Sequence, residues 1–510
     1  MNRAGMTLVA LVTIATGTSA CTGRDFRPAP MLTEYRPARQ TTPTPAAGDD
    51  AEAFRATPPP SAPTKPPPAQ PLPVEVKLSN GIRVLMLERH DFPSISAVMV
   101  LDRGASAAPP GVAELYASAL LGSSTEYKSK DAFQYLTFVG AEVFETATRD
   151  AVTLQLTALS PLFISALSRA APMFTSPSLD GDDLDDARTQ LAARHARADT
   201  APADVAHDAL FAAVFAPPHP YGTPIAGRPA RLGHGAAGKG EQPSAEVTDA
   251  AVRAFRASNL SADHIAVTVV GDFKPAPIQR ALENVLGKVP KAASSKASAF
   301  PPVLPKGGRK LVVIDRPGAA QSSVAIGWPG PRASDPELVA LEVLAGAAGG
   351  DISTRLNLTV RKELGASYGV HMRAIGLRDG GIVTVTAATD TARTVESVRG
   401  MLREIERLRT EPISSGELFA AKLRTFHELE HGSTRGLARE LARGMAEGLP
   451  AMGILARNAR VEMITAADVR AAAERYLATD EMRVVVVGDA AKILDGLKSL
   501  GGFEVSVASP

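Results

Sequence analysis

Hydrophobic and polar positions follow two periods along the body of the chain. Short stretches over 76–89, 94–101, 151–159, 310–314, 323–328 and 381–387 are rich in apolar and β-branched residues, which is typical of strands. Between them apolar residues recur every three or four positions, as in amphipathic helices. This mixture predicts an α+β fold, in which helices pack on one face of a mixed or antiparallel sheet.

One part of this pattern occurs twice. Residues 248–272 read TDAAVRAFRASNLSADHIAVTVVGD, and residues 465–489 read TAADVRAAAERYLATDEMRVVVVGD, at a constant offset of 217 without a gap. Each copy is a helical segment, a turn and a β-branched strand that ends in Gly-Asp. Such a match implies duplicated units of about 210 residues. We expect two tandem, pseudo-symmetric domains at 74–290 and 309–510, with a linker at 291–308.

The N-terminal region predicts export. Arg3, an apolar run over 6–15 and small residues over 16–20 are typical of a signal peptide at 1–20, and the run is too short to span a bilayer as a stable helix. Cys21 follows Ser19-Ala20, which resembles the lipobox of bacterial lipoproteins, although Thr18 stands where Leu is usual. The resemblance implies acylation of Cys21 and an outer-membrane lipoprotein that faces the periplasm. The alternative is an ordinary signal peptide and a secreted product.

Composition limits the kinds of segment, partner and cross-link that we expect in this protein. The segment 21–73 is rich in Pro, Ala and Thr, and we expect it to be a disordered tether. The formal net charge is only +1, with 55 Lys and Arg against 54 Asp and Glu, so there is no electrostatic reason to expect a nucleic-acid partner. With a single cysteine, no internal disulfide can form.

Several motifs in the body resemble the insulinase/pitrilysin family of zinc metallopeptidases over most of residues 74–490. They are the opening hairpin LSNGIRV at 78–84, the Gly140-Ala141 passage that leads to Asp150, the loop His219-Pro-Tyr-Gly222 with Gly227, and, in the second unit, Gly349-Gly350 followed by RKELG at 361–365 and Tyr368. The family's fold is then implied, with two homologous α+β domains. Active members join two such pairs as a clamshell around an unfolded peptide. Because this chain holds one pair, the resemblance implies a dimer.

The family's catalytic motif is missing from its place. Active members carry His-x-x-Glu-His on the first helix of the first unit, where the two histidines bind zinc and the glutamate activates water, and a glutamate on a later helix completes the site. The corresponding residues here are Glu114, Ala117 and Ser118, and Arg194 stands near the place of the distal glutamate. A lone carboxylate does not hold zinc, and a cation would repel it. The resemblance therefore predicts a homologue without the zinc site and without a cofactor.

Two residues of this chain keep the spacing of two substrate-contacting residues of the family. Arg361 and Tyr368 keep the seven-residue interval of the arginine and tyrosine that reach the substrate near the metal, and the resemblance implies peptide binding. Alternatively, Arg361 pairs with a helix carboxylate and Tyr368 is a half-buried strand residue. His219 is a weak candidate for a ligand, and its loop is also explained by packing.

A complete motif stands in an unexpected place. Residues 427–431 read HELEH, and on a helix His427 and His431 would share a face with Glu430 beside them. A third zinc ligand would come from Glu337 or Glu342 on the first helix of the second unit. Against this, the motif lies on the helix equivalent to the one that bears the distal glutamate, and Gly432-Ser433 indicates a solvated helix end.

These observations lead to three hypotheses. The first is a non-catalytic subunit that binds or stabilises unfolded peptide and pairs with an active zinc peptidase, or with its own copy, in the cell envelope. The second is a zinc endopeptidase that uses the motif at 427–431. The third is a stand-alone binding or scaffold lipoprotein.

Overall fold

The computed structural model describes residues 72–227, 247–292, 300, 308–429, 433–450, 453–454 and 456–508. All of them belong to one compact unit, Gln70–Pro510, which is separate from Met1–Ala69. Cys21, all but the last two residues of the tether and most of the linker at 291–308 lie outside the described residues. No helix in the described ranges has the length and apolar character needed to cross a membrane.

The first half of this unit is built on a six-stranded sheet. The strand order is β1-β2-β6-β3-β5-β4, and every neighbouring pair is antiparallel except β2 and β6. The expected strand at 76–89 is a hairpin that turns at Ser79–Gly81. The strands are β1 (Val74–Lys77), β2 (Arg83–Glu88), β3 (Ser94–Leu101), β4 (Glu142–Ala147), β5 (Val152–Leu159) and β6 (Ile265–Gly271).

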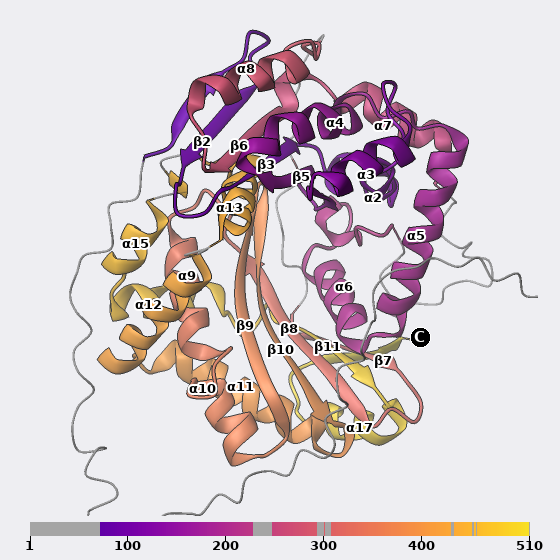
Figure 1. The fold of residues 1–510 in the computed structure, drawn as a ribbon. Coiled ribbons are helices and arrows are strands. Elements are labelled where there is room, and N and C mark those ends of the chain that lie inside the picture. The colour runs from indigo at the N-terminus through magenta and orange to yellow at the C-terminus, as the bar shows by residue number, and fades with distance from the viewer. Residues whose placement is uncertain are drawn as a thin grey trace, which may run out of the picture. The chain divides into compact units, whose positions relative to one another are not determined.

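The second half repeats this arrangement. Its order β12-β7-β11-β8-β10-β9 contains β7-β11-β8-β10-β9, which corresponds strand by strand to β2-β6-β3-β5-β4, including the parallel first pair. The fold is therefore the expected pair of pseudo-symmetric α+β units (Figure 1). The strands are β7 (Lys310–Asp315), β8 (Gln321–Gly330), β9 (Ser367–Leu377), β10 (Gly380–Asp390), β11 (Arg483–Gly488) and β12 (Glu504–Ala508).

Helices accompany each sheet. The first half contributes α2 (Val112–Ala119), α3 (Ser129–Phe138), α4 (Phe163–Thr175), α5 (Gly181–Thr200), α6 (Pro202–Val214), α7 (Asp249–Asn259) and α8 (Pro275–Leu286). The second half contributes α9 (Glu337–Ala348), α10 (Arg355–Asn357), the π-helical turn η5 (Leu358–Glu363), α11 (Thr394–Thr410), α12 (Ser415–Leu429), α13 (Thr434–Ala446), α15 (Arg457–Met463), α16 (Ala466–Tyr476) and α17 (Ala490–Lys498).

The repeated segment folds alike in both halves. It forms α7 and β6 in the first half and α16 and β11 in the second. Thr248 and Thr465 occupy the two N-cap positions, where each hydroxyl accepts a backbone N–H of the first turn. Thr465 and Asp468 complete a capping box. The duplicated sequence thus encodes the start of the helix as well as the strand.

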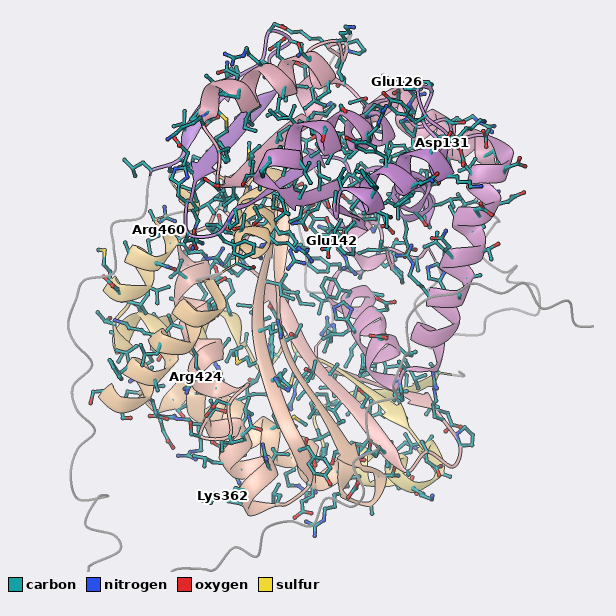
Figure 2. The ribbon with its side chains drawn as sticks, in the orientation of Figure 1. Glu126, Asp131, Glu142, Lys362, Arg424 and Arg460 are labelled. Carbon is teal, nitrogen blue, oxygen red and sulfur yellow. The ribbon has the colours of Figure 1, made fainter. Side chains whose placement is uncertain are left out.

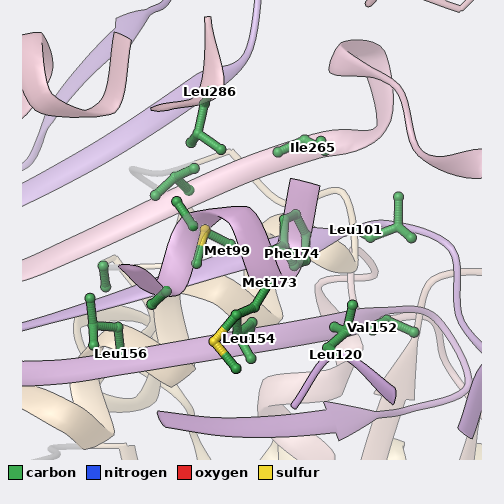
Figure 3. Close-up of a cluster of buried hydrophobic side chains, with 14 of the residues drawn as sticks. Met99, Leu101, Leu120, Val152, Leu154, Leu156, Met173, Phe174, Ile265 and Leu286 are labelled. Atoms are coloured by element: carbon green, nitrogen blue, oxygen red, sulfur yellow. The ribbon is translucent and has the colours of Figure 1, made fainter. Parts of the chain in front are cut away.

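Successive side chains of a strand point to opposite faces of the sheet, so the core of the first half lies on both faces of its sheet. Met99 (Figure 3) belongs with Val84 and Met86 to the cluster under the helical layer, whereas Leu85 and Val98 belong to a second cluster on the opposite face. Because both faces are apolar, both need a cover.

In each half, the second face of the sheet is covered by a helix from the other half. Helix α13 packs on β3 and β6 of the first sheet, and α6 packs on β8 and β11 of the second (Figure 1). Leu437 and Leu441 of α13 join the cluster around Leu85, and Leu210 of α6 joins the cluster around Val312. The two halves therefore exchange one helix each. The sequence pattern predicts the helical layer on one face but not this exchange.

Candidate functional site

Helix α2 carries the residues that correspond to the zinc motif. It begins after Gly111, which has a left-handed backbone with φ +79°, and it packs on α5, α7 and β4. Gly227 of the loop that begins at His219 lies against the backbone of Gly111, where a Cβ would clash. Ala117 and Ser118 are buried and Glu114 is partly buried. The loop thus fixes the start of α2, and the helix presents Glu114 and Ser118 one turn apart.

Two direct contacts link α2 to α5 at this place. The Nε2 atom of His195 lies 2.8 Å from Oε2 of Glu114. The guanidinium of Arg194 donates to Oγ of Ser118 at 3.3 Å and to Oε1 of Glu145, on β4, at 3.3 Å. The side chains of Glu114, Glu145 and His195 are only 12–23% exposed. We call these five residues, Glu114, Ser118, Glu145, Arg194 and His195, the α2–α5 bridge.

The α2–α5 bridge does not fit a zinc ion. Zinc sites in proteins need three or four Cys, His, Asp or Glu ligands. Ala117 has no donor atom, Ser118 offers only a hydroxyl, and Arg194 brings a permanent positive charge to within hydrogen-bond distance of that hydroxyl. In the part of the chain that the structure describes, no group of three or more His, Cys, Asp or Glu side chains could hold a metal ion. The chemistry left at this place is that of an ion pair and hydrogen bonds.

Arg361 and Tyr368 are both presented to solvent. Arg361 lies on the turn η5 and is exposed, and Tyr368 lies at the start of β9 and is 88% exposed. The alternative that Tyr368 is half-buried is therefore wrong. Among the described residues Arg361 has no hydrogen bond or ion pair, so the alternative of a helix carboxylate partner finds no support. Both side chains are free to contact a ligand.

His219 acts in packing. Its ring lies against Phe215, Tyr221 and Phe300, and its Nδ1 atom accepts the backbone N–H of Tyr221. It is 5% exposed, and this burial lowers the pKa of its imidazole. These contacts account for the ring and for Nδ1, whereas the buried Nε2 atom has no hydrogen-bond partner among the described residues.

Tyr221 of the same loop joins the two halves. Its hydroxyl donates to Oδ1 of Asp150 at 2.5 Å and accepts the backbone N–H of Asp379 at 3.1 Å. Asp379 lies in the turn between β9 and β10, so the loop of the first half holds the hairpin of the second. Burial and the neighbouring Asp150 raise the pKa of Tyr221, which keeps the phenol protonated as a donor.

The motif at 427–431 lies at the edge of the described residues. Helix α12 ends at Leu429, the side chain of His427 is outside the description, and Glu430 and His431 lie outside the described residues altogether. The two carboxylates proposed as third ligand are described, and both are engaged by arginines. Glu342 pairs with buried Arg457, and Glu337 pairs with Arg475 at 2.7 Å.

Sequence reasoning did not single out His195 or Glu145. Both belong to the α2–α5 bridge, but they lie 81 and 31 residues from Glu114 in the chain. The available signal was that His195 directly follows Arg194, which stands near the place of the family's distal glutamate. Glu145 gave no signal, because a charged residue at alternate positions of a strand usually faces solvent.

Comparison with known proteins supports this reading of the fold. Residues 246–424 match the family described as the peptidase M16 inactive domain. A protein of Streptomyces coelicolor, named as an uncharacterised zinc protease, is 24% identical over 61% of this chain and 66% of its own length, just under two thirds.

Solved structures give the same result. The peptidase M16 inactive domain from Pseudomonas fluorescens has a TM-score of 0.72 and 20% identity, covering 82% of this chain and 98% of that one. A chain of Complex III2 from Candida albicans has a TM-score of 0.67 and 16% identity, covering 83% and 98%. The chain therefore has the two-domain fold of the insulinase/pitrilysin (M16) peptidases, and its residues 246–424 match the inactive-domain model of that family.

Proposed function

We propose that this protein is a non-catalytic M16 subunit, which binds unfolded peptide and pairs with an active zinc peptidase in the cell envelope. The observation that carries the proposal is the α2–α5 bridge. At the place where active members hold zinc between two helices, Arg194 and His195 bind directly to Ser118 and Glu114. The helices α2 and α5 and the strand β4 around them are present, so the proposed loss affects only the side chains that would bind zinc and activate water.

Peptide binding is supported by a free strand edge beside the α2–α5 bridge. Among the described strands, β4 pairs only with β5 and has no neighbour on its other side. An extended peptide can add to such an edge through main-chain hydrogen bonds. Phe144 on β4 is 49% exposed, and Glu142 on the same strand (Figure 2) pairs with Arg435 of α13. Exposed Arg361 and Tyr368 offer further contacts to such a peptide.

Pairing with a second chain is supported by the family. A chain similar to this one comes from Complex III2, an assembly by its name. The described residues form one pair of domains, and we propose that a second pair completes a clamshell. We propose an active family member with an intact His-x-x-Glu-His motif as the partner, and a second copy of this chain as the alternative.

The proposed envelope location rests on the N-terminal sequence. Cys21 would carry the lipid, and the Pro-rich segment would hold the folded body away from the membrane. A Cys21→Ala variant tests this step. We expect the native protein in the detergent-soluble membrane fraction and the variant in the soluble envelope fraction. Equal membrane association of both proteins would contradict the lipid anchor.

The proposed function is tested with the purified protein and an unfolded, fluorescently labelled peptide. We expect saturable binding by anisotropy and, by mass spectrometry, an intact peptide after prolonged incubation with added zinc. Cleavage that disappears in a His427→Ala/His431→Ala variant would overturn the proposal in favour of an enzyme. Gentle purification from native membranes tests the partner: isolation of this chain alone would favour a stand-alone binding lipoprotein.

A further inference from the structure

A cleft of about 610 Å³ lies in the helical layer of the first half. Its walls are formed by α4, α7, the end of α8 and the loop around Tyr127, between α2 and α3. It contains none of the residues of the α2–α5 bridge. Its volume lies in the range of sites that bind small molecules or a few residues of a peptide.

The charged groups in this cleft favour a monovalent anion. Arg256 and Lys288 line it, and Glu126 (Figure 2) is the one carboxylate among its lining residues. These groups leave one net positive charge, which suits a carboxylate better than a doubly charged phosphate. Arginine presents several N–H donors in a planar fork that matches a carboxylate.

Arg256 has donor capacity that the described residues leave unused. Its Nε atom is buried and has no hydrogen-bond acceptor in the described part of the chain. Burial raises the pKa of the Tyr116 phenol, and the positive charge of Arg256 opposes this rise. Because the Nε atom is closed to solvent, an anion in the cleft would bind the terminal nitrogens of Arg256.

The remaining lining divides into two kinds of groups. An apolar wall is formed by Pro172, Leu260, Val285, Val289 and Pro290. Hydroxyl and amide groups come from Thr125, Ser168, Thr175, Ser176 and Asn284. The apolar wall fits a hydrophobic side chain. The hydroxyl groups of Ser168, Thr175 and Ser176 donate to helix carbonyls, so their oxygens can accept the N–H groups of a peptide, which an alkyl chain does not have.

We propose that this cleft binds the free C-terminal end of a peptide whose last residue is apolar. The carboxylate lies between Arg256 and Lys288, the last side chain lies on Leu260 and Val285, and the preceding amide bonds to the hydroxyl groups. The site is separate from the residues that carry the proposed function, so each can fail without the other.

The test is calorimetric titration of the full chain with N-acetyl-leucyl-leucine as the free acid and as the C-terminal amide. We expect one binding site that prefers the acid by at least about tenfold, since the amide cannot accept two charge-assisted hydrogen bonds. Lys288→Gln should weaken binding of the acid about fivefold, and Arg256→Lys, which keeps the charge and loses the fork, about tenfold or more.

Controls separate this site from general effects. Arg399→Gln removes an exposed cation of the second half and should leave the affinity unchanged. Lys288 is exposed, so its substitution tests the site even if Arg256→Lys disturbs folding. Equal affinity for acid and amide, tighter binding of inorganic phosphate or decanoate, or no saturation at millimolar acid would each overturn the proposal.

Discussion

At the scale of single residues, the proposed function rests on hydrogen bonds between α2 and α5. Arg194 and His195 on α5 meet Ser118 and Glu114 on α2 at 3.3 and 2.8 Å. A metal ion would connect these helices through its ligands, and here side chains connect them directly. Under the proposed function, the backbone arrangement would still suit a metal and only the donor side chains would be missing.

Restoring the donor set should restore zinc binding. The variant Glu114→His/Ala117→Glu/Ser118→His/Arg194→Glu places two histidines one turn apart and a carboxylate on the facing helix. We expect about one zinc per chain by atomic emission and a rise in Tm with zinc that the native protein lacks. A control without Arg194→Glu should bind zinc more weakly. Failure of the full variant would show that the helices are not arranged for a metal.

Tyr368 and Arg361 should contribute to peptide binding without contributing to stability. Tyr368→Ala removes an aromatic side chain that is 88% exposed, so the change in the free energy of unfolding should stay within about 0.5 kcal/mol. We expect a loss of affinity for unfolded peptide of about tenfold, typical of a tyrosine at the centre of an interface. Met463→Ala, at a position that is 78% exposed, is the control. Unchanged affinity in Tyr368→Ala/Arg361→Gln would remove both residues from the binding surface.

At the scale of helices and strands, the exchange of α6 and α13 ties the two halves into one unit. Leu210 on α6 lies over Gly327 of β8, where a larger residue would clash with it. The backbone carbonyl of Ala438 on α13 accepts a hydrogen bond at 2.9 Å from the hydroxyl of Thr268, a buried polar residue of β6. Each sheet therefore depends on a helix of the other half for burial of its second face.

Shortening one exchanged side chain should destabilise the whole unit. Leu441→Ala and Leu210→Ala each remove a fully buried side chain, and we expect a loss of about 2–5 kcal/mol in the free energy of unfolding. Because both halves share the helices, a single unfolding transition should shift in both variants. Leu423→Ala, which is 53% exposed, should change little. Two separate unfolding transitions, one for each half, would show that α6 and α13 do not hold the two halves together.

The sequence predicted the duplicated units because their signal is local. The helix, its cap and the β-branched strand follow one another within 25 residues, so the repeat at 248–272 and 465–489 was visible. The strands also carried a signal that the second face of each sheet is covered. Runs such as RVLMLE in β2 are apolar on both faces, which indicates that both faces are buried. What could not be predicted is the helix that covers the second face, because α13 lies more than 150 residues from β6.

At the scale of the whole molecule, a buried polar junction holds the two halves together. Arg378, in the turn between β9 and β10, donates to the backbone carbonyls of Asp102, Asp150 and Ala446. The neighbouring Glu447, at the end of α13, is 8% exposed. A charged network of this kind specifies one arrangement of the halves, because any other would leave its groups unpaired.

Glu447 should make stability depend on pH. Burial raises its pKa from 4.5 to about 7, with Arg443 and Arg378 opposing the rise and Glu440 and Asp150 adding to it. Between about pH 4.5 and 7 the unfolded chain releases this proton and the folded chain keeps it, so stability falls as pH rises through this window. The loss is on the order of 3 kcal/mol.

Glu447→Gln should flatten this part of the pH profile. Chemical unfolding at pH 5, 6, 7 and 8 measures the effect, with Glu474→Gln, an exposed residue, as the control. We expect the native protein and the control to lose stability from pH 5 to pH 7 and the variant to lose less. Parallel profiles for all three proteins would show that Glu447 is ionised throughout.

The measurement that tests the central claim most directly is the zinc content of the purified native chain, beside the His427→Ala/His431→Ala variant and the restored quadruple variant. The account predicts no stoichiometric zinc in the native chain or the histidine variant, and about one zinc per chain in the restored one. Stoichiometric zinc in the native chain would contradict the claim. Its loss in the histidine variant would then place the metal at 427–431.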